Sequence, residues 1–420
     1  MAERTLSIRP YDPDRDLESI SRIMLDVGWQ KPSERAERMA ARRRFYDAAA
    51  GFVAELDGSV ECYVSTMAGT YQYRDTPLPF AGVTGVVTSR VARKQGLASR
   101  TTAKALAHQG REGAVVAGLG IFDQGFYNKL GFGTAAYDHF ATIDPASLTV
   151  PYCRRTPVRL SAADAAEMHA ARLTRLVRHG SVTLSAQEST IQRTLGSESD
   201  FGLGFRDETT GELTHHLWVS ATNINAGPYH VSWMSYRTVA QLIELLGLLR
   251  NLGDQVYAVW LAEPPGIQLQ DFIDRPLRRH RQGRRGEFET SINAAAQFQY
   301  RIVDVPSAMN AAVASFRRRG ATLPAFTMQV LDSASRYLSA EDGWTGCGGV
   351  FRVGPDGAQP AEPDASVDLK IGIGDLTRLW LGVVPATTLR DTGAATVDEE
   401  LAQTLDDAFD GPVPHTDWFY

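Results

Sequence analysis

The residues best suited to chemistry lie between positions 86 and 100, where an apolar strand leads through a polar loop into a helix. Successive backbone N–H groups at a helix start have no partner inside the helix, so such a turn binds anions. Gly96 permits close approach of the backbone to a ligand, while Arg93, Lys94 and Arg100 add positive charge. Ala98 keeps the first helical turn open. The spacing RxxGxA predicts a pyrophosphate site, although an ordinary basic loop fits it too.

A second segment, from Gly125 to Gly133, contains one tyrosine at Tyr127. A tyrosine hydroxyl can act as a proton donor in catalysis. The same ring is also a common amphipathic core residue whose hydroxyl has found a hydrogen-bond partner. Both roles fit Tyr127 when these residues are considered alone.

The end of the chain is unusually apolar, because it closes with Trp418, Phe419 and Tyr420 after two prolines. Chain ends usually fray and are polar. Burial of these rings contributes several kcal/mol, at about 1.5–3 kcal/mol for each large apolar side chain. We therefore expect a docked tail, which serves either packing alone or the placement of the terminal carboxylate.

Composition excludes several classes of protein. The 420 residues carry a formal charge of −6, which argues against nucleic acid as the main partner. No apolar run reaches about 18 residues, so we expect no membrane span. The first residues lack the apolar core of a signal peptide, which predicts a cytoplasmic protein. The three cysteines are far apart, and the histidines form no HExxH or HxxxH pattern, so we expect no metal site.

The elements that position these residues form a mixed α/β succession. We predict a strand, two helices, three strands, a helix at 96–110, a strand at 114–120, a short helix at 124–130 and a strand at 136–143. Residues 157–295 follow a similar order, which indicates a degenerate internal repeat. A third unit is predicted to open with a strand at 299–303 and to contain further strands and helices up to residue 420.

This succession resembles the GNAT acetyltransferases, whose pyrophosphate loop is Q/R-x-x-G-x-G/A. The segment from Gly125 to Gly133 is similar to the family pattern G-x-Y-x-x-x-G-F/Y-G, and in that family a tyrosine at this place protonates the departing thiolate. A second GNAT-like segment without a cofactor loop and a third similar to sterol carrier proteins resemble the Eis (enhanced intracellular survival) family. Arg301 to Pro306 and Leu405 to Phe409 carry further likeness.

The resemblance implies an α/β (α+β) fold with two tandem GNAT-like domains and a sterol-carrier-protein-like α+β domain, bounded at 1–156, 157–295 and 296–420. It implies catalytic roles for Tyr127 as general acid and for the α-carboxylate of Tyr420 as general base. A member of the family ends in phenylalanine, so the side chain departs here while the carboxylate is present. The implied acetyl-CoA-binding residues are Val86, Val87, Thr88, Arg93, Lys94, Gln95, Gly96, Leu97, Ala98, Ser99, Phe122 and Asp123.

The resemblance further implies a homohexamer that acetylates primary amines of polycationic small molecules, such as aminoglycosides or polyamines. Asp26, Trp29 and Asp417 are the implied substrate-binding residues. Residues 356–420 include 13 acidic and three basic residues. This acidic excess either concentrates cationic amines near the active site or is simply a solvated surface. Two alternatives stay open, a protein lysine N-acetyltransferase and a non-catalytic lipid or sterol carrier.

Overall fold

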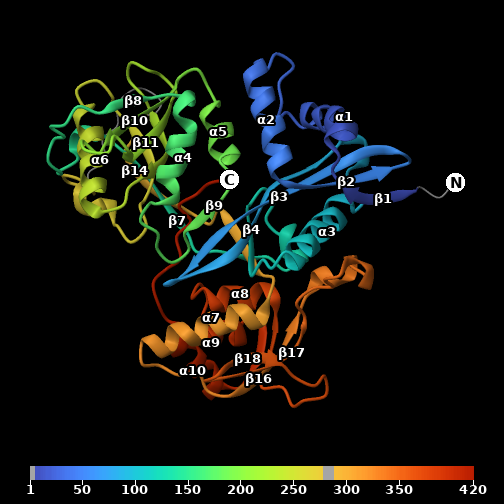
Figure 1. Cartoon of the computed structure of the whole chain (residues 1–420). Helices are drawn as coiled ribbons and strands as arrows, with labels where there is room; N and C mark the ends of the chain where they lie inside the picture. The colour runs from blue at the N-terminus through green and yellow to red at the C-terminus, as the bar shows by residue number, and fades with distance from the viewer. Residues whose placement is uncertain (1–4, 278–287) are drawn as a thin grey trace. The chain divides into compact units, whose positions relative to one another are not determined.

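The computed structural model describes residues 5–277 and 288–420 and divides into two compact units (Figure 1). The first unit comprises Met1–Ala136, His179–Ala186 and Ala296–Tyr420. The second comprises Tyr137–Arg178 and Gln187–Ala295. Each unit is therefore assembled from segments that are distant in sequence.

The first unit contains a sheet of order β1-β2-β3-β4-β5-β15-β6, in which β9 also pairs with β3. Helices α1 and α2 cover one face of this sheet and α3 covers the other (Figure 1). The strands are β1 (Leu6–Pro10), β2 (Ala50–Leu56), β3 (Ser59–Tyr73), β4 (Thr76–Thr88), β5 (Val116–Gly120), β6 (Gly133–Thr134), β9 (Val182–Leu184) and β15 (Phe298–Ile302). The helices are α1 (Pro13–Asp26), α2 (Ala36–Ala48) and α3 (Leu97–Arg111).

The second unit repeats this topology, with the sheet order β14-β7-β13-β12-β11-β10-β8. In both sheets one parallel pair, β4–β5 or β12–β13, is flanked by antiparallel strands. The strands are β7 (Asp138–Ile143), β8 (Val158–Leu160), β10 (Asp200–Arg206), β11 (Leu213–Ala221), β12 (Tyr229–Ser235), β13 (Val259–Ala262) and β14 (Ser291–Ala295). The helices are α4 (Ala165–Leu173), α5 (Glu188–Thr194) and α6 (Val239–Asn251). The predicted internal repeat is confirmed by this order of strands.

Two strands lie in a different sheet from the one that the order of elements along the sequence suggests. The strand predicted at 136–143 to end the first domain is β7, and it pairs with β13 and β14 in the second sheet. The strand predicted at 299–303 to open the third domain is β15, and it pairs with β5 and β6 in the first sheet. Strand β7 thus belongs to the second sheet although it precedes the predicted boundary at 156, and β15 belongs to the first sheet although it follows the predicted boundary at 295. The two boundaries themselves stay predictions.

The remainder of the first unit is an α+β layer built on the sheet β18-β17-β16-β19-β20. Its strands are β16 (Phe326–Leu331), β17 (Gly349–Gly354), β18 (Gly357–Pro360), β19 (Leu369–Gly372) and β20 (Ala395–Val397). Its helices are α7 (Val305–Arg318), α8 (Ile373–Trp380), α9 (Ala386–Asp391) and α10 (Glu399–Phe409). Buried Phe316, Trp380 and Phe409 fill its interior. The long strand β3 reaches this layer, because Tyr73 stacks on Trp380 with ring centroids 4.0 Å apart.

Candidate active site

The loop before α3 has the geometry of an anion site. Lys94 and Gly96 adopt positive φ values of 61° and 80°, which turn the chain sharply into the helix. Gly96 is the N-cap and offers no side chain to cap it. Within residues 5–277 and 288–420, the backbone N–H groups of Leu97, Ala98 and Ser99 donate to no other group. Free N–H groups at a helix start next to exposed cations favour a phosphate ligand.

The sheet opens beside this loop. Strands β4 and β5 pair in parallel only from Phe80↔Val116 to Val83↔Leu119. Thr84 is then inserted as a bulge against β3, since Ser65 pairs with Gly85 and Thr66 pairs with Val83. From the bulge to Thr88, β4 pairs with β3 alone. Within the described residues, the edge of β4 that contains Val86, Val87 and Thr88 thus has no strand partner on the β5 side, as the predicted acetyl-CoA contact requires.

Side chains along β4 and β5 alternate between two cores. Ala81, Val83, Ala117 and Leu119 face α3, and Tyr127 belongs to the same cluster. Phe80 and Val116 face the opposite side, where Tyr420 packs. Alternation along strands therefore brings the two predicted catalytic tyrosines to opposite faces of the sheet at its split.

Tyr127 begins a single turn of 3-10 helix, η2 (Tyr127–Leu130), and is buried with only 7% of its surface exposed. Its ring packs edge-on against Phe126 and Phe132, with centroids 4.9 and 6.1 Å away. Burial, with smaller contributions from Asp123 and Cys62, raises the pKa of Tyr127 to about 12. The phenol therefore stays protonated at neutral pH, as a proton donor must.

The two glycines after η2 are required by packing. Gly131 has φ of 79°, and a β-carbon there would collide with Ile373 and approach Arg301 Nη1 to 3.2 Å. A β-carbon at Gly133 would collide with the carbonyl oxygen of Gly374. The glycines of the tyrosine motif thus let η2 and β6 lie directly against the start of α8.

The C-terminal tail is docked as predicted. Trp418 is buried, His415 N–H donates to the His179 carbonyl at 2.9 Å, and Asp417 Oδ1 accepts from Val182 N–H at 3.2 Å. These contacts align the tail (red in Figure 1) with β9.

Tyr420 packs beside the last paired positions of β4 and β5, next to the split, where Gly82 and Gly118 leave room for its ring. β-carbons at Gly82 and Gly118 would lie 3.3 Å from Cε2 and 2.8 Å from Oη of Tyr420, and one at Gly120 would lie 4.0 Å from its backbone oxygen. Within the described ranges, no Lys, Arg or His side chain forms an ion pair with the terminal carboxylate. Glycines recurring on apolar strands were the sequence signal for this close approach.

The other predicted residues lie in three places. The loop from Arg93 to Gly96 is exposed, whereas Leu97 and Ser99 are buried under it. Phe122 is 80% exposed on the segment between β5 and η2, beside Asp123. Asp26 and half-exposed Trp29 lie at the end of α1, where the Asp26 carbonyl accepts from Arg90 Nε at 2.7 Å. Whether they share a pocket with Asp417 stays a prediction.

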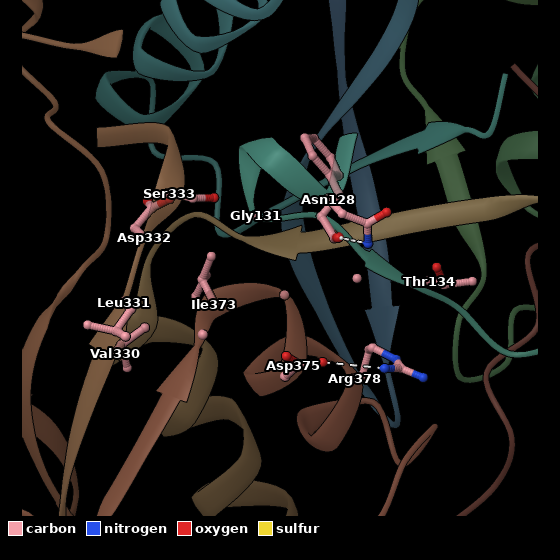
Figure 2. A pocket seen from close by; sticks show the side chains of 14 residues that line it. Asn128, Gly131, Thr134, Val330, Leu331, Asp332, Ser333, Ile373, Asp375 and Arg378 are labelled. Carbon is pink, nitrogen blue, oxygen red and sulfur yellow. Dashed lines mark hydrogen bonds and ion pairs between the residues drawn. The ribbon is translucent and has the colours of Figure 1, made fainter. Parts of the chain in front are cut away.

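A cavity of about 490 Å³ lies on the η2 side of the first sheet (Figure 2). Asn128 and Thr134 line one part, and Asp332 and the ion pair of Asp375 with Arg378 line another.

Among the residues that the structure describes, no helix is long and apolar enough to cross a bilayer. No group of three or more His, Cys, Asp or Glu side chains in those same ranges is placed to hold a metal ion.

Comparison with known families identifies two parts of the chain. Residues 8–135 match the family model described as acetyltransferase (GNAT) domain, and residues 322–417 match the sterol carrier protein domain. A search of curated protein sequences gave no match.

Solved structures with the same fold cover almost the whole chain. A probable N-acyltransferase from Enterococcus faecalis aligns over 100% of both chains with a TM-score of 0.77 and 17% identity. Eis1 from Mycobacterium abscessus aligns over 99% of this chain and 100% of its own, with a TM-score of 0.72 and 16% identity. A GCN5-related N-acetyltransferase from Kribbella flavida covers 99% of both chains, with a TM-score of 0.71 and 17% identity. The tandem GNAT and sterol carrier architecture is therefore confirmed.

Proposed function

Starting from a chain whose first domain is a GNAT acetyltransferase with an Eis-like fold, we propose that it transfers the acetyl group of acetyl-CoA to primary amines of polycationic small molecules. The observation that carries this proposal is the split between β4 and β5. Unpartnered helix N–H groups lie beside it, Tyr127 is on one face and Tyr420 is on the other. The experiment that tests this proposal measures thiol release from acetyl-CoA in the presence of defined amines.

Acetyl-CoA fits the residues around the split. Its pyrophosphate would bind the N–H groups of residues 97–99 with support from Arg93 and Lys94. The cofactor would lie along Val86 to Thr88, where β4 pairs with no strand of the described residues on the β5 side. Phe122 and Asp123 lie on the segment that follows β5 and are proposed to contact the cofactor.

The proposed reaction is direct attack of the amine on the thioester carbonyl. An amine with a pKa of about 10.4 arrives as ammonium and must first lose a proton, which the terminal carboxylate of Tyr420 accepts directly or through water. The new N–C bond would form while the C–S bond breaks, and Tyr127 would donate its proton to the leaving thiolate. The attacking nitrogen would lose its second proton to water, and Tyr127 would regain a proton from water. A free α-carboxyl has a reference pKa of about 3.3–3.7, a weak base for an ammonium, so it would need desolvation or a relaying water to work.

We expect acetyl-CoA to bind once per chain, on the first domain. Helix α6 occupies the place of α3 in the second unit, but its first turn is already capped, since Thr238 accepts from the N–H of Gln241. Only Tyr236, Arg237 and Thr238 separate β12 from α6, too few residues to surround a pyrophosphate. Titration calorimetry should give a stoichiometry of one, and two equivalent sites would contradict this assignment.

We also propose a homohexamer in the cytoplasm, on the resemblance to the Eis family alone. Light scattering at micromolar concentration is expected to give a mass near six times that of the 46.0 kDa chain. A stable monomer would contradict the proposed assembly without affecting the assignment of the catalytic groups.

The carrier alternative is less well supported by the third layer of the chain. Its interior is occupied by Phe316, Trp380 and Phe409, all less than 3% exposed. The cavity of about 490 Å³ lies at the edge of this layer, beside η2, and is lined by charged and polar groups as well as apolar ones. A lipid site needs a mainly apolar lining.

A further inference from the structure

Strand β15 lies between β5 and β6 in the sheet that contains the candidate active site, although it follows β6 by more than 160 residues in sequence. It pairs antiparallel with β5 along its whole length, from Phe298↔Gly120 to Ile302↔Val116. Its other edge pairs with β6 through Gln299↔Thr134 and Tyr300↔Gly133. Because side chains alternate along a strand, β15 presents residues to both faces of the sheet.

The odd-numbered side chains of β15 bind the turn that carries Tyr127. Gln299 is fully buried and donates from Nε2 to Asn128 Oδ1 at 3.1 Å and to Thr134 Oγ1 at 3.1 Å. Arg301, also fully buried, donates from Nη1 to the carbonyl of Leu130, the last residue of η2. The turn is thus held at two points by one strand.

Arg301 is itself fixed in place by charge. Its Nη2 lies 2.7 Å from Oδ2 of Asp332, and neither side chain of the pair is exposed. Asp332 also accepts from the N–H groups of Ala334 at 2.9 Å and Cys347 at 2.9 Å. A buried guanidinium needs such a partner, and its planar fork serves the carboxylate and the carbonyl together, which a lysine ammonium cannot do as well.

The even-numbered side chains of β15 hold the tail. The Phe298 ring lies 5.8 Å from the Tyr420 ring and 5.4 Å from that of Phe419. The hydroxyls of Tyr300 and Thr416 are 2.5 Å apart and form a buried hydrogen bond. Tyr300 also lies over Gly118, next to the Tyr420 hydroxyl.

We propose that β15 is the common positioning strand of the active site, with Gln299 and Arg301 fixing the turn of Tyr127, and Phe298 and Tyr300 fixing the tail that ends in Tyr420. This inference rests on the proposed function, because it assumes that those two groups are the acid and the base. The strand would then set the separation of acid and base across the sheet. Misplacement of a catalytic group by about 1 Å can cost about 10²-fold in rate.

The test is a pair of double-mutant cycles. They measure whether the odd-numbered residues of β15 affect kcat through Tyr127 and whether the even-numbered residues affect it through the Tyr420 carboxylate. Arg301→Lys retains a positive charge beside Asp332 but loses the fork that reaches Leu130. Gln299→Met removes the donor, and the freed groups of Asn128 and Thr134 line a cavity where water can reach them. Each variant is expected to lower kcat by about 10- to 10²-fold. In a Tyr127→Phe background, neither is expected to lower kcat further.

The even side is tested with Tyr300→Phe, which removes only the hydroxyl bonded to Thr416. It is expected to lower kcat in the wild type and in the Tyr127→Phe background alike. Its effect should disappear in an enzyme extended by one glycine after Tyr420, where the carboxylate is already displaced. Ile371→Val, a buried truncation on β19, serves as the stability control and should leave kcat unchanged.

The outcomes separate the two levels of the argument. If Tyr127→Phe alone keeps full kcat, the assignment of the acid is wrong. If Tyr127→Phe is impaired but Arg301→Lys multiplies the loss in that background, the acid is right and the positioning role is wrong. Thermal melting and acetyl-CoA calorimetry on every variant identify those that are not folded. If Arg301→Lys is not folded, the result with Gln299→Met, the mildest change, tests the positioning role of the odd-numbered residues.

Discussion

Replacing Tyr127 by phenylalanine is expected to lower kcat by about 10²–10⁴-fold, the usual contribution of a positioned proton donor. The change removes one oxygen and leaves the ring contacts with Phe126 and Phe132 in place. The thermal midpoint and the Kd for acetyl-CoA should therefore stay near those of the wild type. Steady-state thiol release, with melting and calorimetry on the same preparations, measures all three quantities.

Tyr137→Phe is the matched control, because the same atom is removed from a ring that is 65% exposed. Its kcat should equal that of the wild type. Since burial raises the pKa of Tyr127 to about 12, the wild-type enzyme should show no loss of rate from deprotonation of this group up to about pH 10. A Tyr127→Phe enzyme with a kcat within twofold of the wild type would contradict the role of this residue as general acid.

Adding one glycine after Tyr420 is expected to lower kcat by about 10²-fold or more while acetyl-CoA still binds. The extension keeps the buried Trp418 ring and the partly buried Phe419 and Tyr420 rings but moves the carboxylate by about 3.5 Å. The loss should appear in kcat, because the base acts after both substrates are bound. Rates at saturating amine and saturating acetyl-CoA test this directly.

Tyr420→Phe provides the control for this extension. The Tyr420 hydroxyl is buried and has no hydrogen-bond partner in the described part of the chain, so its removal should cost little stability or even increase it. The carboxylate stays in place, and kcat should be close to that of the wild type. If the extended enzyme is folded and keeps full kcat, the tail serves packing only.

The local parts of the fold were predictable from the sequence. The turn before α3 follows from a strand, a polar loop with Gly96 and an alanine-rich helix, all within about 25 residues. The tandem repeat followed from the order of elements, and the docked tail followed from three consecutive rings before the end. In each case neighbouring residues determine the outcome.

The pairing partners of β7 and β15 were not predictable in this way. Both strands are short, with sequences DHFATI and FQYRI, and nothing in so few residues specifies which sheet edge they join. The roles of Gln299 and Arg301 were hidden for the same reason, since their partners Asn128 and Leu130 are 171 residues away in sequence. The glutamine and the arginine that alternate with large apolar residues in this strand were the one available signal that it does more than pack.

The predicted acidic excess near the C-terminus is partly structural. Asp398 caps α10 through the N–H of Leu401, and Asp406 accepts from the hydroxyl of Thr387 at 2.5 Å. Asp406 is half-buried and Asp398 is exposed, and both are engaged in these local hydrogen bonds, so a count of charges overstates the acid that is free to attract cations. Attraction of a cationic substrate is therefore better tested with individual residues such as Asp26 and Asp417.

The central claim, acetyl transfer to small polycationic amines, is tested most directly by thiol release from acetyl-CoA across a panel of acceptors. The panel contains an aminoglycoside, a linear polyamine, a lysine-containing peptide and no amine, with mass spectrometry of each product. Thiol release with the small polyamines, matched by products heavier by one acetyl group for each thiol released, is the predicted result. Acetylation of the peptide alone would favour the protein lysine acetyltransferase, and no thiol release with any amine would contradict the account.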